Sequence, residues 1–590
     1  MASKYQVLER LRACMKNEGL VGEALSAYLI PTDDAHQSEY IAECDKRRVY
    51  VTGFTGSAGI AIVTDDRALL WTDGRYHLQA SQQIDPSLWT LMKQGNSGIP
   101  SVAEWLSKEL PSDARIGFDP NLISEALYKS YEEALEYTGQ QLVAITTNLV
   151  DEVWSDRPPR PAGPLMVLPL HYTGRSLQEK VEDVRIEMAK KGADVLVITA
   201  LDEVAWLFNL RGSDVPYNPV FFAYALITTT AVGLFLEVDR LTPDVTQHLT
   251  GGELMVDILP YSTVNSRLSI MLHGNPQWKI WISNKSSYDL TSLVPKQRRV
   301  SGLSPIQMLK AVKNEIELQG MRNAQLRDSC AVCEYLAWLE GEVPKGYLTE
   351  ITAADKLEAF RKEQVDYVSL SFATISSSGP DGAIIHYCPT PETDRKLSMD
   401  ELYLCDSGGQ YKDGTTDVTR TVHFSTPTDK QKEAFTRVLK GHIALCSVVF
   451  PSKLQVGLDY KHGTGHGVGA FLNVHEGPQG INQRWADEGL HAGMVVTDEP
   501  GFYEDGEFGI RIENVVIVKN ADTKYNFGGG GYLTFEPITL MILPELLTLN
   551  EIDWLNKYNA TCFEKVGELL RQQGKMDVLR WLQRETEPLG

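Results

Sequence analysis

One order of elements occurs twice in the first 300 residues, and this repetition constrains the fold more than any other feature. Each copy begins with an amphipathic helix, over residues 5–18 and 177–191. Apolar strands follow: "LSAYLI", "VTGFTGSAGIAIVT" and "RALLWT" in one copy, "ADVLVITA", "LFNLRGSDVPYNPVFFAYALIT" and "VGLFLE" in the other. Between the copies, "RPPRPAGP" (157–164) has the composition of a linker. The pattern predicts a duplicated α/β domain of about 150 residues.

A different kind of domain is expected after the second copy. Ser304-Pro305 suits the start of a helix, and two further helices are predicted over 315–341 and 348–363. Segments rich in Val, Ile, Thr and Tyr follow, separated by Gly-rich turns, so this domain is predicted to be α+β with antiparallel strands. Seven of the twelve histidines lie from His386 to His491. This clustering indicates that the last domain carries the chemistry.

Composition excludes several classes of protein. The net charge of −22 argues against a nucleic-acid-binding protein, since phosphate contacts need a basic surface. No run of about 18 apolar residues predicts a membrane span, and the polar N-terminus does not resemble a signal peptide. The eight cysteines are scattered except for Cys330 and Cys333, which we interpret as one face of a helix. We expect a cytoplasmic protein with reduced cysteines.

Two aspartates enclose a turn-rich segment, "DSGGQYKDGTTD", at positions 406 and 417. In a β-hairpin they would repel each other unless a cation lies between them. The midpoint precedes the turn signal Asp413-Gly414, so a bulge or a wider loop would be needed to set them face to face. From this segment alone, a turn with a capping Asp417 and a metal site remain equally open.

Two glutamates further along the chain supply more candidate ligands. Glu499 and Glu513 are centred on Gly506 of an Asp-Gly turn, so two strands meeting there would place them opposite each other. A salt bridge from Glu513 to Arg511 or Lys519 is the competing interpretation. In "HGTGHG", His466 lies among glycines that allow close backbone approach. Four carboxylates with one imidazole suit two divalent metal ions, which predicts a dinuclear metallohydrolase.

At these motifs the sequence resembles the pita-bread metallopeptidase family (M24), and within it the three-domain Xaa-Pro aminopeptidases. The resemblance covers nearly the whole chain. It rests on "GFTGSAG", "LLWTDGRY" and "EVAWLFNLRGSDVPYNPVFFAYA" in the first two domains and on "GAIIHYCPTPE", "HGTGHGVG", "EPGFYEDGEFGIRIEN" and "LTFEPITL" in the third. It implies two creatinase-like α/β domains, residues 1–156 and 165–303, followed by a pita-bread α+β catalytic domain over 304–590.

The resemblance also implies a role for each metal ligand. Asp417 and Glu513 would bridge two divalent metal ions, usually Mn2+ in this family. Asp406 would complete one metal site, and His466 with Glu499 would complete the other.

Four further residues match substrate-site or other active-site positions of the family. His386 and His475 would position the scissile carbonyl and the proline, and His462 and Arg511 resemble further active-site residues. The implied reaction is removal of the first residue from short peptides with a penultimate proline, by attack of a metal-bridging hydroxide. Homodimers are expected from the resemblance alone, and neither nucleic acid nor membrane is an expected partner.

One segment departs from the family pattern. Only "SKLQV" separates Pro451 from Gly457, where relatives carry a further helix, and the region between "LTFEPITL" and "EIDWLN" is a few residues short. Extended residues can bridge the gap. We expect the shorter segment, 451–457, to affect stability and activity while leaving the metal ligands in place.

Two alternatives to this function differ in what they predict. A prolidase would use the same five ligands on Xaa-Pro dipeptides, although the duplicated N-terminal domain and the histidine motifs favour the aminopeptidase. A non-catalytic scaffold on the same fold would lose the ligands, and this chain keeps all five.

Overall fold

The chain folds into two compact units. The computed structural model describes residues 3–448, 450–451, 460–482, 488–523, 531–540 and 549–589. The N-terminal unit comprises Met1–Val167, Leu177–Pro216 and Val220–Ile306, and the C-terminal unit comprises Leu168–Ser176, Tyr217–Pro219 and Gln307–Gly590. No helix among the described residues is long and apolar enough to cross a membrane.

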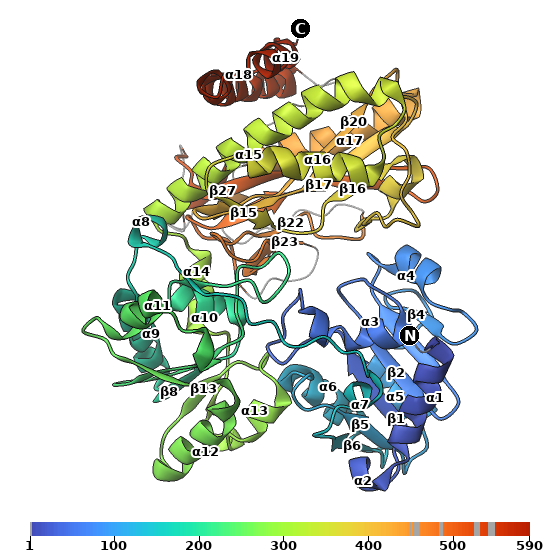
Figure 1. The fold of residues 1–590 in the computed structure, drawn as a ribbon, viewed down its shortest axis with the longest axis vertical. Helices are drawn as coiled ribbons and strands as arrows, with labels where there is room; N and C mark the ends of the chain where they lie inside the picture. Colours follow the sequence, from blue (N-terminus) through green and yellow to red (C-terminus); the bar gives the residue numbers. More distant parts are fainter. Residues whose placement is uncertain are drawn as a thin grey trace. The chain divides into compact units, whose positions relative to one another are not determined.

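The N-terminal unit contains two six-stranded sheets with the same topology (Figure 1). In the first, β1 pairs antiparallel with β2 and parallel with β5, β2 pairs antiparallel with β3, and β4 and β6 form parallel edges. In the second, β8, β10, β11, β12, β13 and β14 repeat this pattern strand for strand. The predicted duplication is thereby confirmed.

The elements of the first copy follow the apolar segments of the sequence. The first helix ends at Met15, three residues earlier than predicted, because Asn17 caps a separate short helix. The strands are β1 (Ala27–Pro31), β2 (Ile60–Thr64), β3 (Ala68–Thr72), β4 (Thr90–Lys93), β5 (Arg115–Phe118) and β6 (Gln141–Ala144). The helices are α1 (Lys4–Met15), α2 (Glu18–Val21), α3 (Arg47–Thr52), α4 (His77–Gln83), α5 (Val102–Glu109), α6 (Glu125–Leu135) and α7 (Leu149–Val153).

The second copy begins after residues 157–164, which form neither helix nor strand. Its strands are β8 (Val195–Ile198), β10 (Tyr224–Thr228), β11 (Val232–Leu236), β12 (Val256–Pro260), β13 (Ile280–Ile282) and β14 (Arg299–Val300), with β7 (Met166–Val167) paired to β9 (Leu210–Arg211). Its helices are α9 (Leu177–Lys191), α10 (Leu201–Leu207), α11 (Pro243–Thr250), α12 (Val264–Gly274) and α13 (Tyr288–Ser292). The predicted helix 177–191 has the same bounds in the structure.

The C-terminal unit is α+β, with mainly antiparallel strands. Two three-stranded sheets, β15-β18-β19 and β16-β17-β20, accompany a six-stranded sheet, β21-β28-β27-β24-β22-β23, and the hairpin β25-β26. The strands are β15 (Tyr367–Leu370), β16 (Ile375–Ser378), β17 (Leu402–Ser407), β18 (Gly409–Tyr411), β19 (Gly414–Thr415), β20 (Val418–His423), β21 (Phe450–Pro451), β22 (Gly465–Gly467), β23 (Glu476–Ile481), β24 (Val495–Asp498), β25 (Gly501–Glu504), β26 (Phe508–Arg511), β27 (Asn514–Asn520) and β28 (Tyr532–Pro537).

Several helices of this unit pack around a common apolar core. They are α8 (Leu170–Thr173), α14 (Pro305–Ala311), α15 (Glu315–Glu342), α16 (Glu350–Lys362), α17 (Asp429–Cys446), α18 (Leu549–Gln572) and α19 (Met576–Glu585). Asn314 caps α15 in a capping box with Glu317. Figure 1 shows α18 and α19 beside α15, and apolar residues of all three helices belong to one core. Cys330 and Cys333 are buried residues of α15 in that core, which confirms that they form one face of a helix.

A buried ion pair supports the strand that carries the first candidate ligand. Arg361 of α16 donates to both oxygens of Asp328 on α15, at 2.7 and 3.0 Å, and to Ser407 Oγ at 3.1 Å. Both charged side chains are almost fully buried. Tyr411 adds a hydrogen bond to Asp328, at 2.9 Å. The helices therefore fix both ends of the segment 407–411, immediately after Asp406.

Most of the segment that the sequence predicts to be shortened, 451–457, lies outside the described residues. The structure places Phe450 and Pro451 in β21, paired with β28, and describes the chain again from Tyr460. The short region before "EIDWLN" also lies largely outside the described residues.

Replacing Arg361 by methionine is expected to destabilise the C-terminal unit by about 3–5 kcal/mol. The substitution leaves the Asp328 carboxylate buried without its cation. Urea denaturation followed by fluorescence measures the change. Arg437→Met is the matched control, because Arg437 pairs with Glu433 on an exposed helix face and should change stability by less than about 0.5 kcal/mol. Equal effects of the two substitutions would contradict this account.

Candidate active site

The first pair of candidate ligands lies along two successive antiparallel ladders, β17-β20 and β18-β19, which belong to different sheets. Asp406 is the Cα partner of Thr419, and further out Tyr411 is the partner of Gly414. The same register holds along both strands, with Lys412 and Asp413 at the tip, so no bulge intervenes. Asp417 is two residues before Thr419, and it therefore lies diagonally to Asp406 on the same face. The two aspartates are close without being directly opposite.

The second pair lies directly across a hairpin, as its turn signal predicts. Gly501 pairs with Arg511 in one ladder, and Asp498 pairs with Asn514 in the next. Both ladders keep one register, which sets Glu499 opposite Glu513 at the gap between them. Gly506, at the tip, has a positive φ of 80°, a conformation that favours glycine.

Two glycines allow the strand that carries His466 to approach β24 and β23. A Cβ atom at Gly465 would lie 2.0 Å from the Thr497 carbonyl oxygen, and one at Gly467 would lie 2.4 Å from the Glu476 carbonyl oxygen. His466 Nδ1 lies 2.9 Å from the Gly467 carbonyl oxygen, which can only accept a hydrogen bond. In the neutral ring the proton is therefore on Nδ1, which leaves Nε2 as the nitrogen that can bind a metal ion.

Three of the five predicted metal ligands form a tight group. One ligand atom each from Asp417, His466 and Glu513 lies within 4.8 Å of the other two. The fourth, Glu499, places Oε1 3.6 Å from His466 Nε2. Asp406 belongs to the same electrostatic cluster, with one buried oxygen, Oδ1, that has no hydrogen-bond partner among the described residues. These oxygen and nitrogen donors, with an unpartnered buried carboxylate oxygen, fit divalent cations.

The crowded carboxylates perturb one another. Burial raises the pKa of Glu513 well above its ordinary value, and the charges of Asp417, Asp406 and Glu499 raise it further. Burial also raises the pKa of Asp406 to about 6, although Arg511 opposes this shift. For His466, burial lowers the pKa, but Asp417 and Glu499 outweigh it and bring the value to about 9. Without a cation the site thus takes up protons, which is the response of an excess of negative charge.

Arg511 connects the site to a tyrosine that the sequence analysis missed. Arg511 donates to Asp406 Oδ2 at 2.7 Å and to the Tyr503 hydroxyl at 2.6 Å. The Tyr503 hydroxyl lies 2.8 Å from His462 Nε2, whose ring points Nδ1 at the Gly463 carbonyl oxygen. Tyr503 thus donates to His462 and accepts from Arg511. Nothing in the local sequence distinguishes Tyr503 from an ordinary strand residue.

The remaining predicted residues lie at different depths around this group. The ring of His475 packs edge-on against that of His466, with centroids 4.3 Å apart. His462 Nδ1 is 3.7 Å from Glu499 Oε2. His386 is half-buried, and its neighbour Ile385 accepts a hydrogen bond from Arg511 at 3.3 Å. His475 and His462 thus contact the ligand group, whereas His386 is connected to it through the adjacent backbone.

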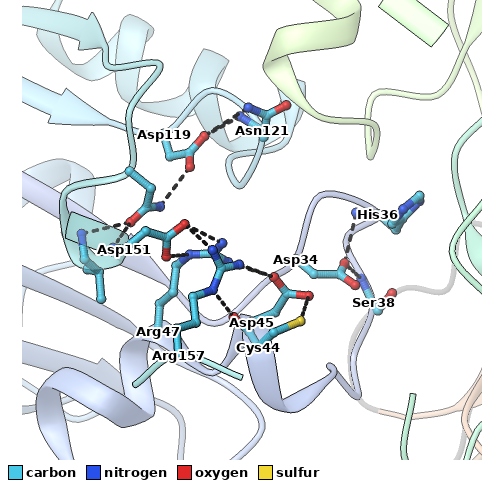
Figure 2. Close-up of polar contacts among 12 residues, drawn as sticks. Asp34, His36, Ser38, Cys44, Asp45, Arg47, Asp119, Asn121, Asp151 and Arg157 are labelled. Carbon is cyan, nitrogen blue, oxygen red and sulfur yellow. Dashed lines mark hydrogen bonds and ion pairs between the residues drawn. The ribbon is translucent and has the colours of Figure 1, made fainter. Parts of the chain in front are cut away.

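A polar cavity of about 400 Å3 lies in the N-terminal unit, and charged side chains that line it form ion pairs with one another. Figure 2 shows Arg47 and Arg157 with their carboxylate partners. Arg47 pairs with Asp151 and Asp45 at 2.7 and 2.9 Å, and Arg157 pairs with Asp151 at 2.7 Å. These charges neutralise one another. Among the described residues, groups of three metal-ligating side chains occur only in the C-terminal unit, so the candidate active site is there.

Family models match both units of the chain. Two models of the creatinase/prolidase N-terminal domain match residues 8–153 and 156–317. The model of metallopeptidase family M24 matches residues 319–520, and a model of the C-terminal region of that peptidase matches 531–589. Creatinase-type N-terminal domains before an M24 domain define the class of protein.

Relatives match the chain from end to end. It is 47% identical to a Xaa-Pro aminopeptidase of Drosophila melanogaster, with both chains fully covered, and 46% identical to a probable Xaa-Pro aminopeptidase P of Aspergillus niger, over 99% of this chain and 98% of the relative. Its structure matches that of the X-prolyl aminopeptidase of Caenorhabditis elegans, described as a cytosolic enzyme with a di-nuclear active site, with a TM-score of 0.96, 40% identity and full coverage of both chains. This chain belongs to metallopeptidase family M24, among its Xaa-Pro aminopeptidases.

The Drosophila alignment also bears on the length of this chain. It runs over 613 positions, so at least 23 of them have no counterpart among the 590 residues here. The alignment length does not locate these positions.

Glu513→Gln is expected to imitate the protonated carboxyl and to separate metal binding from folding. Because the pKa of Glu513 is raised in the folded state, the metal-free wild-type protein should lose stability as the pH rises above about 4.5, by up to about 1.4 kcal/mol per pH unit until the folded-state pKa is passed. Glu513→Gln has no carboxyl proton to release at this position, so it does not lose this stability as the pH rises. Thermal unfolding in a chelator, from pH 5 to 8, should show its advantage growing with pH.

Manganese should stabilise the wild-type protein but not Glu513→Gln in the same assay. At 100 times the dissociation constant, binding adds about 2.7 kcal/mol to the wild type and little to Glu513→Gln. Glu507→Gln, an exposed carboxyl on the same hairpin, should behave as wild type in both respects. A pH-independent difference, or full stabilisation of Glu513→Gln by manganese, would rule out the role given to Glu513.

Proposed function

We propose that this chain hydrolyses the bond between the first residue of a peptide and a penultimate proline, using two divalent metal ions. The observation that carries the proposal is the convergence of Asp417, His466 and Glu513 within 4.8 Å of one another, with Glu499 beside them. The identity to Xaa-Pro aminopeptidases over the full chain supports the substrate class.

Five side chains would hold the metal ions. Asp417 and Glu513 would bridge them, Asp406 would complete one site, and His466 with Glu499 would complete the other. Manganese is the proposed metal, although zinc and cobalt accept similar donors. Metal ions in such a site lower the pKa of bound water and polarise a carbonyl oxygen.

The protein's own side chains would orient the substrate and fix the ligands. Arg511 holds Asp406 in place through the 2.7 Å ion pair and leaves its other oxygen, Oδ1, for a metal ion. His475 packs on His466 and, with His386, would position the scissile carbonyl and the proline. The hydroxyl of Tyr503 holds His462 in one orientation beside Glu499. Arg511 and His462 are thereby placed to fix the site while the peptide binds.

Selectivity for proline has a physical basis. A prolyl nitrogen carries no N–H, and its ring fixes φ, so a site that relies on backbone donors cannot bind such a peptide in the usual way. The negative charge of the site suits the free ammonium group of the substrate.

The proposal extends to the organisation of the protein. Domain boundaries near 156–165 and 303–304 are part of the proposal, and the two duplicated sheets followed by separate antiparallel sheets support them. A homodimer, a cytoplasmic location and short peptides as substrates are further parts of the proposal. The cytosolic Caenorhabditis elegans enzyme supports the location.

The manganese-loaded protein should release arginine from Arg-Pro-Pro and leave Arg-Ala-Pro intact, because only the first peptide has proline at the second position. Chromatography of the products measures both reactions. Activity should disappear in a chelator and return with manganese. Cleavage restricted to the dipeptide Arg-Pro would instead indicate a prolidase.

Loss of a single ligand should separate an enzyme from a scaffold on the same fold. Glu499→Gln should reduce kcat by at least about 100-fold, since it removes a carboxylate from one metal site. Glu507→Gln, an exposed carboxyl at the tip of the neighbouring hairpin, is the matched control and should retain activity. A wild-type chain that binds less than one manganese ion and cleaves neither peptide would refute the proposed enzyme.

A further inference from the structure

A second buried cluster lies directly behind the paired glutamates. Asp498 is the last residue of β24, Asn514 is the first residue of β27, and the two are Cα partners. Both are fully buried. They are the immediate chain neighbours of Glu499 and Glu513. Since consecutive residues of extended chain point to opposite faces, Asp498 and Asn514 face away from the ligand group.

One imidazole from α17 joins these two strands. His442 Nδ1 lies 3.1 Å from Asp498 Oδ2, and His442 Nε2 lies 3.1 Å from Asn514 Nδ2. His442 is itself fully buried. We call His442, Asp498 and Asn514 the His442 bridge. The bridge joins β24 to β27 at the pair Asp498–Asn514. Each of these residues is one position along the chain from Glu499 or Glu513.

Neighbouring side chains fix the orientation of the bridge. Arg420 donates to Asn514 Oδ1 at 2.9 Å, so the amide nitrogen faces His442 as a donor. His442 Nε2 must then accept, which places the proton of the neutral ring on Nδ1, 3.1 Å from Asp498 Oδ2 but not aligned for a hydrogen bond to it. The same Arg420 donates to the backbone carbonyl of Glu513 at 2.7 Å. The contacts thus reach the backbone of a metal ligand.

A cysteine one helical turn from His442 completes the contacts to Asp498. Cys446 Sγ lies 3.0 Å from Asp498 Oδ2 and donates its S–H proton to it. Burial raises the pKa of this thiol well above its ordinary value, so it remains a donor. Asp498 therefore contacts α17 at two successive turns, although a carboxylate with no exposure is costly to keep in an apolar interior.

We propose that His442 is a positioning residue, and that its bridge between Asp498 and Asn514 sets the separation of Glu499 and Glu513. The inference rests on the ligand roles in the proposed function. A shift of the two strands by a fraction of an ångström would change the geometry of both metal sites, because the glutamates are one residue from the bridge. Such supporting contacts typically change metal affinity or activity by about 10–100-fold.

The test compares full-length variants in two measurements: manganese affinity by competition with a fluorescent chelator, and kcat and KM on Arg-Pro-Pro. His442→Leu removes both contacts and should weaken manganese binding and lower kcat by about 10–100-fold, with KM within about twofold. His442→Gln keeps one donor and one acceptor and should recover most of both losses. Asp498→Asn removes the charged end of the bridge and should lower kcat at saturating manganese by about tenfold.

Leu439→Ala is the matched control, since Leu439 is a fully buried residue of the same helix that belongs to the apolar core. It should lower the melting temperature but leave manganese affinity and KM unchanged within about twofold. Positioning is overturned if His442→Leu and Asp498→Asn retain wild-type affinity and kcat, or if Leu439→Ala reproduces their losses. If His442→Leu does not fold, the manganese affinity and kcat of Asp498→Asn and His442→Gln decide whether the bridge positions the glutamates.

Two other outcomes have separate meanings. A wild-type chain that binds no manganese and cleaves no peptide refutes the proposed function itself. A third bound metal ion per chain that is lost in Cys446→Ala would show that His442, Cys446 and Asp498 ligate metal, and would overturn the positioning role.

Discussion

Mutual repulsion among buried carboxylates is the constraint on which the rest of the C-terminal unit depends. Asp406 and Glu513 lie close to Asp417 and Glu499, and burial already raises the pKa of Asp406 and of Glu513. A chain that only needed stability would place apolar side chains there. The divalent cations of the proposed function would turn this repulsion into ligation. The raised pKa values of Glu513 and Asp406 are the cost of this arrangement in the metal-free protein.

The fold sets these groups with two ladders that differ in one respect. Asp406 and Asp417 are diagonal neighbours, whereas Glu499 and Glu513 are directly opposite. Contacts with residues outside the ligand group fix the position of each pair of strands. Arg361 and Asp328 fix the strand after Asp406, and the His442 bridge spans the strands beside the two glutamates. A buried ion pair and a buried imidazole thus have the same task, which is to hold acidic side chains close together.

The sequence predicts those features that local spacing determines. The Asp505-Gly506 turn predicts the opposition of Glu499 and Glu513, and the repeated order of helices and strands predicts the duplicated sheets. Local spacing does not reveal contacts between distant segments. Tyr503 looks like an ordinary strand residue until its hydroxyl is seen between Arg511 and His462. His442 resembles a core histidine of an amphipathic helix, and only the register of β24 with β27 shows what it joins. The diagonal placement of Asp406 and Asp417 likewise depends on a register that their turn signals left open.

Anomalous diffraction from crystals of the manganese-loaded protein tests the central claim most directly. The account predicts two manganese peaks about 3.5–4 Å apart, with Asp417 and Glu513 bridging them, Asp406 on one ion, and His466 with Glu499 on the other. A single peak, no peak among these side chains, or manganese bound only at His442, Cys446 and Asp498 would contradict it.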